Sequence, residues 1–145
     1  MITYDFFENG RLLIEKFPGT LDKSYLRSYM EFISLKLPDS IELVLADFRK
    51  TELNLGVNDL LPLIALQEDM TKGIKHKIIN VHLVDTPKET ALSTLFSLNF
   101  PNSNNLIHIC STINTALILL GLKLTEQEIE DTLQNLAFQF KRPDY

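Results

Sequence analysis

Residues 78–89 have the sequence IINVHLVDTPKE, in which a strand-like run passes directly into a helix start. Apolar and polar residues alternate through the first half, as they do in a half-buried β-strand. Thr86 and Glu89 have the spacing of a capping box, and Pro87 stands at the first helical position, where a missing N–H has no intrahelical partner to lose. The stretch therefore predicts a β-strand that ends near Asp85 and an α-helix that follows it.

The same order of strand and helix is indicated at two more places. An apolar run at 41–49 contains Asp47 near its end, and another at 106–110 is followed by Ser111 and Thr112. Repeated strand-helix units predict an α/β fold with parallel strands. In such folds ligands bind beyond the carboxyl ends of the strands, so these acids and hydroxyls are candidate site residues.

The residues before these units predict a β-hairpin. Asn9 and Gly10 separate two strand-like runs, 2–8 and 11–17, and both turn residues tolerate a positive φ. Helical spacing of apolar residues then predicts helices at 21–37, from about 58 to 73, at 87–98, over a short segment ending at 121, and at 125–140.

Alternation within the strands predicts how the sheet is covered. Ile79, Val81 and Leu83 alternate with Asn80 and His82, so one face of the sheet is apolar and the other is mixed. We therefore expect a right-handed βα superhelix, with a mixed sheet of about five strands and helices mainly on one face. The second face is expected to be partly open, or covered by the terminal helix or a partner subunit.

The composition is that of one compact globular domain, with 145 residues of which 45% are hydrophobic and 23% are charged. A net charge of −5 disfavours a nucleic-acid partner, because phosphate contacts need clustered lysines and arginines. The longest apolar segment, 116–122, is too short to span a membrane. The single cysteine, Cys110, cannot form an intrachain disulfide, so we expect a cytoplasmic protein.

Three short segments carry a family resemblance. Residues 44–49, 81–87 and 110–112, with a short helix closing at 119–122, resemble the bacterial STAS-like proteins, which are akin to anti-sigma-factor antagonists. The resemblance covers about residues 1–124. That fold is also similar to the CRAL-TRIO lipid-binding domains, which share the one-sided βα superhelix.

The resemblance implies a STAS-like α/β domain over 1–124 and a C-terminal amphipathic helix with a short tail over 125–145. This last segment is expected to belong to the same domain or to form a dimer contact. The family implies a regulatory or ligand-sensing module more than an enzyme, although a fold does not by itself determine a function.

The chain departs from the family at the phosphorylation site. Antagonists that act as phosphorylation switches carry an Asp-Ser pair at the start of the helix after the third strand, whereas residues 49–58 offer only Thr51 as a hydroxyl. Thr86 and Ser111 stand at helix starts in the next two units, where a phosphate would meet free N–H groups. Thr86, Ser111 and Thr51 are therefore candidate phosphoacceptors, and the alternative is that the first two only cap their helices.

The carboxyl ends of the parallel strands are expected to form a rim that contacts a partner or a ligand. The residues expected there are Asp47, Arg49, Asp85, Thr86, Lys88, Ser111 and Thr112. Convergent acids could hold a cation or act in acid–base chemistry. The alternative is structural, with Asp47 binding loop N–H groups or pairing with Arg49 and Asp85 capping the next helix.

His82, His108 and Cys110 are expected to project from the same mixed face of the sheet. Two imidazoles and a thiol can bind zinc, but their spacing matches no standard metal motif, so we predict no metal site and no cofactor. Phenylalanines suggest a lipid pocket as a further alternative to ordinary core packing, above all Phe96, Phe100, Phe138 and Phe140.

The sequence thus favours a non-enzymatic STAS-like regulatory module that contacts a partner protein, or a second copy of itself, through the rim. The alternative is a CRAL-TRIO-like binder of a small apolar ligand, with a closed cavity under the last helices. A third hypothesis is a metal-assisted hydrolase that uses Asp47 and Asp85. No catalytic residue is assigned under the favoured hypothesis.

Overall fold

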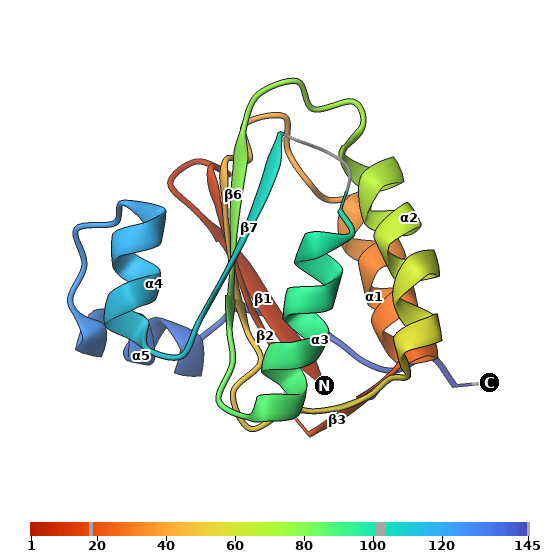
Figure 1. Cartoon of the computed structure of the whole chain (residues 1–145). Helices are drawn as coiled ribbons and strands as arrows, with labels where there is room; N and C mark the ends of the chain where they lie inside the picture. The colour runs from red at the N-terminus through yellow and green to blue at the C-terminus, as the bar shows by residue number, and fades with distance from the viewer. Residues whose placement is uncertain (18, 101–103, 145) are drawn as a thin grey trace.

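The computed structural model describes residues 1–17, 19–100 and 104–144, which form a layered α/β structure (Figure 1). The main sheet has six strands in the order β7-β6-β4-β2-β1-β8. They are β1 (Ile2–Phe7), β2 (Leu12–Lys16), β4 (Leu43–Asp47), β6 (Ile78–Leu83), β7 (Asn105–Cys110) and β8 (Phe138–Phe140). Strands β2, β4, β6 and β7 are parallel, whereas β1 is antiparallel to both of its neighbours. Two short parallel strands, β3 (Thr20–Asp22) and β5 (Glu52–Asn54), pair separately.

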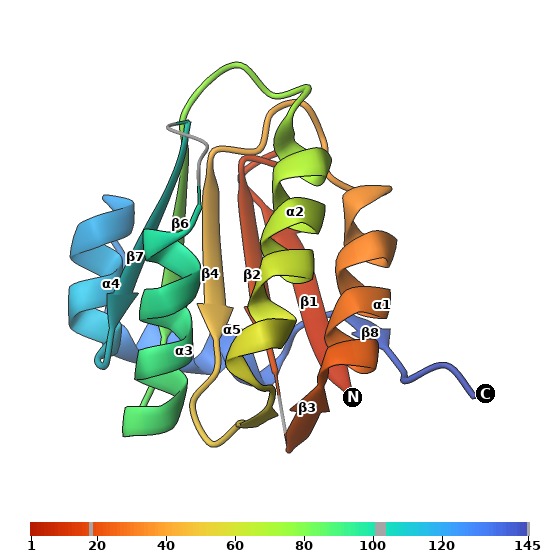
Figure 2. The same ribbon diagram turned by 45° about the vertical axis from the view of Figure 1, so that its right-hand side comes forward.

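Helices lie on both faces of the main sheet (Figures 1 and 2). One face is covered by α1 (Lys23–Ser34), α2 (Leu60–Thr71) and α3 (Pro87–Leu98), and the 3₁₀ helix η1 (Val57–Asp59) leads into α2. The other face is covered by α4 (Ile113–Leu120) and α5 (Glu126–Gln134). This confirms the predicted mixed sheet with most helices on one face. Among the described residues, no helix combines the length and hydrophobicity needed to cross a membrane.

The start of α3 follows the capping signals of the sequence, with one difference. Thr86 Oγ1 accepts the backbone N–H of Glu89 at 3.3 Å, and Pro87 lies in the first turn. The Glu89 side chain was expected to complete a capping box. It is instead buried, and its Oε1 accepts the backbone N–H of Leu53 at 3.0 Å. Glu89 therefore holds β5 against α3.

The strand register divides the side chains between two hydrophobic cores. Leu45, Val81 and Leu83 belong to the core beneath α4 and α5. Asn80 and His82 alternate with them and face the space beneath α1, α2 and α3. The face with Asn80 and His82 is therefore the face that three helices cover, and the more apolar face receives the two shorter helices.

The C-terminal segment differs from the prediction. The helix expected over 125–140 ends with α5, and Phe138–Phe140 forms the edge strand β8 beside β1. By pairing with β1, β8 supplies hydrogen-bond partners for the backbone N–H and C=O groups on the outer side of β1. The apolar residues here do not share one helical face, because Ile129 and Leu133 enter the core under α4 and α5 whereas Phe140 packs on the opposite core.

Replacing Phe140 by alanine is expected to lower the free energy of unfolding by roughly 2 kcal/mol. The ring is half-buried, with its centroid 4.8 Å from that of Phe32 and 5.5 Å from that of Tyr29. Gln139→Ala, at the exposed neighbouring position, is expected to change stability by less than about 0.5 kcal/mol. Urea unfolding followed by circular dichroism would measure both, and equal effects would contradict this placement of β8.

Candidate functional site

A cavity of about 120 Å³ lies between the sheet and helices α1, α2 and α3. Side chains of β2, β4, β6 and β7 form its floor, and side chains of the three helices form its roof. Most are apolar, but the floor includes the polar residues Glu15, Asn80, His82 and Asn105. An engineered apolar cavity of about 150 Å³ in another protein binds benzene, so this cavity has the size for a molecule built on about one aromatic ring.

Glu15, Ala46 and His82 form one row across three adjacent strands. The register pairs Glu15 with Ala46 and Ala46 with His82, and all three side chains line the cavity. Neighbouring strands lie about 4.8 Å apart, so the Cα atoms of Glu15 and His82 are about 10 Å apart. The small methyl group of Ala46 lies between them, and a carboxyl and an imidazole therefore border a common space.

Glu15 is an acid in an apolar environment. Its side chain comes from β2, the residue is only 8% exposed, and its Oε1 accepts a hydrogen bond of 2.8 Å from the hydroxyl of Tyr29 on α1. Burial raises the pKa of Glu15 from 4.5 to about 7, and the Tyr29 hydrogen bond offsets only part of this rise. Burial also raises the pKa of Tyr29, so its hydroxyl stays a donor. Near neutral pH the carboxyl is thus present in both protonation states.

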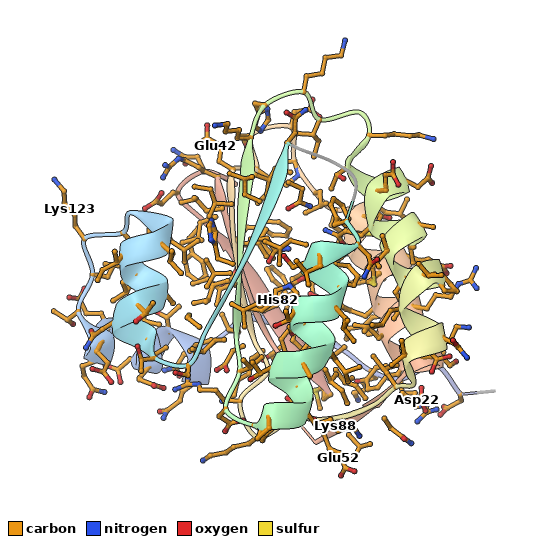
Figure 3. All side chains as sticks on the ribbon, viewed as in Figure 1. Asp22, Glu42, Glu52, His82, Lys88 and Lys123 are labelled. Atoms are coloured by element: carbon orange, nitrogen blue, oxygen red, sulfur yellow. The ribbon has the colours of Figure 1, made fainter. Side chains whose placement is uncertain are left out.

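His82 lies between the sheet and α3 (Figure 3). Its Nδ1 is 3.3 Å from the hydroxyl oxygen of Ser93, and its ring meets that of Phe48 at a centroid distance of 5.3 Å. Burial lowers the pKa of His82 from 6.5 to about 4. The imidazole is therefore neutral at pH 7, with one donor and one acceptor nitrogen.

These two groups influence stability in opposite directions as the pH changes. Glu15 binds its proton more tightly in the folded state, so ionising it removes stability as the pH rises from about 4.5 to about 7. His82 binds its proton more weakly in the folded state, so protonating it removes stability as the pH falls from about 6.5 to about 4. Each shift corresponds to about 3 kcal/mol, and the two contributions largely cancel over the shared pH range.

Two buried amides add unpartnered polar atoms to the cavity wall. Asn80 Oδ1, and both side-chain polar atoms of Asn105, have no hydrogen-bond partner among the described residues. Asn80 is 8% exposed and Asn105 is 5% exposed. A buried polar atom without a partner costs about 1–3 kcal/mol, so such atoms indicate a place for water or for a ligand.

The predicted rim begins with an ion-pair network at the end of β4. Asp47 is 2% exposed, and its two carboxylate oxygens each accept a 3.0 Å hydrogen bond from the guanidinium of Arg49. Arg49 also donates to Glu130 of α5 at 2.8 Å. The Arg49 guanidinium lowers the pKa of Glu130. The pairing expected between Asp47 and Arg49 is confirmed, and it ties α5 to the sheet.

Asp85 supports the loop that follows β4. Its carboxylate accepts the backbone N–H of Lys50 at 3.2 Å, and Lys50 has a φ of 60°. The expectation that Asp85 caps α3 is wrong, because Thr86 fills that position. Residues 50–52 and 85–89 surround a shallow depression, and Figure 3 shows Lys88 and Glu52 at this same end of the molecule. The structure thus brings Asp85, Thr86 and Lys88 together.

The remaining rim hydroxyls differ in exposure. Thr112 caps α4 by accepting the backbone N–H of Thr115 at 3.2 Å, and Ser111 beside it is exposed. Thr51 is 2% exposed, and its hydroxyl donates to the backbone carbonyl of Phe17. Phosphorylation of Thr86, Ser111 or Thr51 stays a prediction.

The expected grouping of His82, His108 and Cys110 is wrong. The register places His82 opposite Ile109 and His108 opposite Val81, so the two histidines project from opposite faces of the sheet. Cys110 belongs to the core under α4 and α5. In the part of the chain that the structure describes, no three side chains of the metal-ligating types gather in one place.

The lipid-pocket hypothesis placed the cavity under the last helices, whereas the cavity lies under the first three. Phe96 lines it and Phe100 stacks on Phe96 with centroids 5.9 Å apart, but Phe138 and Phe140 lie in β8. Sequence reasoning missed Glu15. Glu15 alternates with Leu13 of β2 and with Phe17, which directly follows β2, and both of these belong to the core. This pattern could have identified Glu15 as a buried acid.

We expect Glu15→Gln to become more stable relative to the wild type as the pH rises from about 4.5 to 7, by up to about 3 kcal/mol. The substitution removes the ionisation that burial opposes. Denaturant unfolding of both proteins between pH 4 and 8 would measure the difference. Tyr29→Phe removes the hydrogen bond that lowers the pKa of Glu15. In this variant the loss of stability that accompanies ionisation of Glu15 should therefore continue to a higher pH than in the wild type. A difference that does not change with pH would contradict the burial of an ionisable Glu15.

The comparisons with known proteins concern the fold. No protein-family model matches the sequence, and no curated protein matches it. The structure is similar to the crystal structure of an uncharacterized protein from the DUF3478 family with a SpoIIAA-like fold, from Shewanella loihica PV-4. The TM-score is 0.52 at 16% sequence identity, and the match covers 83% of this chain and 92% of that one. The chain therefore has a SpoIIAA-like fold, as the resemblance to STAS-like proteins implied, whereas the relation to CRAL-TRIO domains stays a prediction.

Proposed function

We propose that this chain is a cytoplasmic, non-enzymatic STAS-like module that binds a small, largely apolar molecule in the cavity beneath α1, α2 and α3. One observation carries the proposal, namely an apolar cavity of about 120 Å³ whose wall includes the unpartnered Asn80 Oδ1. Small-molecule sites are typically concave and mainly apolar, with a few polar groups that orient the ligand. A ligand here would bury apolar surface and supply the missing hydrogen bond.

The chemistry of the polar groups supports binding rather than catalysis. Ser93 Oγ lies 3.3 Å from His82 Nδ1, which is the distance of a nucleophile and its base. Yet the pKa of His82 is about 4, and a general base works best with a pKa near the operating pH. Ser93 is also buried within α3, where backbone N–H groups are engaged in the helix and give no oxyanion site.

A contact with a partner protein at the rim is the second candidate function. Residues 48–53 connect it to the cavity, because Phe48 and Leu53 line the cavity whereas residues 50–52 line the depression at the rim. A ligand that shifts Phe48 or Leu53 would alter the shape of this depression. Such coupling would make the module a sensor, in line with the regulatory role that the STAS-like resemblance implies.

Toluene is expected to raise the melting temperature of the wild-type protein, because a molecule that binds only the folded state stabilises it, by about 1.4 kcal/mol at ten times Kd. Leu63→Trp fills the cavity from α2 and should abolish the shift. Leu61→Trp, on the exposed side of the same helix, should retain it. Thermal unfolding with increasing toluene tests this, and the proposal fails if toluene has no effect on the wild type or the same effect on Leu63→Trp.

A further inference from the structure

The cavity floor carries its smallest side chain between two polar groups. Val44 and Ala46 of β4 line the cavity together with Phe48, which directly follows the strand, and Ala46 has the smallest side chain of the three. Glu15 and His82 flank Ala46 in the register of the sheet. The smallest side chain of the floor therefore lies between a carboxyl and an imidazole, and we call this position the notch.

The charge of the cavity wall restricts what can occupy this notch. The described lining includes no lysine or arginine, and Glu15 is its one acid. A carboxylate or phosphate would lie near Glu15 without a positive partner, which is strongly unfavourable in a buried site. A cation would gain one partner but would lose its hydration, and buried ion pairs recover this cost only with excellent geometry. The wall therefore favours an uncharged polar group.

The hydrogen-bonding capacity of the row matches a group that both donates and accepts. Nδ1 of His82 forms a hydrogen bond with the Ser93 hydroxyl, so Nε2 is the ring nitrogen that can form a hydrogen bond with a ligand. When the Ser93 hydroxyl donates to Nδ1, Nε2 carries the proton and is a donor. Glu15 offers an acceptor on the other side of Ala46, and its Oε1 is already ordered by Tyr29.

We infer that the row Glu15–Ala46–His82 binds the hydroxyl group of a small alcohol or phenol, whose apolar body fills the rest of the cavity. The hydroxyl lies over Ala46, accepts a hydrogen bond from His82 and donates one to Glu15. This inference rests on the proposed function and adds the class of ligand to it. It also gives a functional reason for the buried carboxyl of Glu15.

Isothermal titration calorimetry at pH 8, where Glu15 is mainly ionised and accepts hydrogen bonds, tests the inference with phenol, toluene, benzoate and benzylamine. The four probes share one ring and differ in their polar group. Phenol is expected to bind the wild type roughly tenfold more tightly than toluene, which is the effect of one or two net hydrogen bonds. Benzoate is expected to bind at least roughly tenfold more weakly than phenol, because it brings a second negative group into the site.

Two variants locate the preference within the row. Glu15→Met keeps the length of the side chain without the acceptor, and Ala46→Val fills the notch. Both should reduce the preference for phenol over toluene to less than about threefold, while Glu15→Met keeps its affinity for toluene. Val44→Ile adds one methyl group on the same face of β4, one row away, and should keep the preference.

The outcomes separate this inference from the proposed function. Equal binding of phenol and toluene by the wild type overturns the hydroxyl site and leaves the cavity proposal intact, whereas binding of neither overturns both. Tighter binding of benzylamine than of phenol would assign the row to an organic cation and would also overturn the inference. If Glu15→Met does not fold, Ala46→Val decides, and an unchanged preference in that variant refutes the site.

Discussion

The parallel register of β2, β4 and β6 is the constraint on which the rest of the structure depends. A shift of one residue in such a sheet moves every side chain to the opposite face. With the observed register, Leu45 and Val81 enter the core under α4 and α5, while Ala46 and His82 face α1, α2 and α3. The same pairing aligns Glu15 with Ala46. The cavity floor is thus a direct product of strand pairing.

Local signals predicted the parts of the fold that depend on local chemistry. The hairpin at Asn9-Gly10 and the start of α3 at Thr86 follow from turn and capping preferences, and both agree with the structure. The three short strands β3, β5 and β8 depend on partners far away in the chain, so no local pattern marks them. The site was missed for a related reason. A face that mixes Glu15 and His82 with apolar residues can be exposed or covered as far as the sequence shows, and the helix layer that covers it comes from distant parts of the chain.

The polar residues of the cavity are an exception to the usual composition of a core. Polar groups that break local packing rules are commonly found at functional sites. Glu15 and His82 are both kept mainly uncharged by burial, one by a raised pKa and the other by a lowered pKa. Between these two values the cavity holds groups that form hydrogen bonds without placing a net charge in an apolar interior.

The last segment of the chain contacts both sides of the sheet. Ile129 and Leu133 of α5 enter one core, the Arg49–Glu130 ion pair ties α5 to the end of β4, and Phe140 of β8 packs against α1 on the other face. The two cores therefore share a covalently continuous connection that runs around the β1 edge. If one core unfolds, the C-terminal segment loses its contacts there and no longer holds its other end firmly in the second core. The two layers are therefore expected to unfold together in a single cooperative transition rather than one after the other.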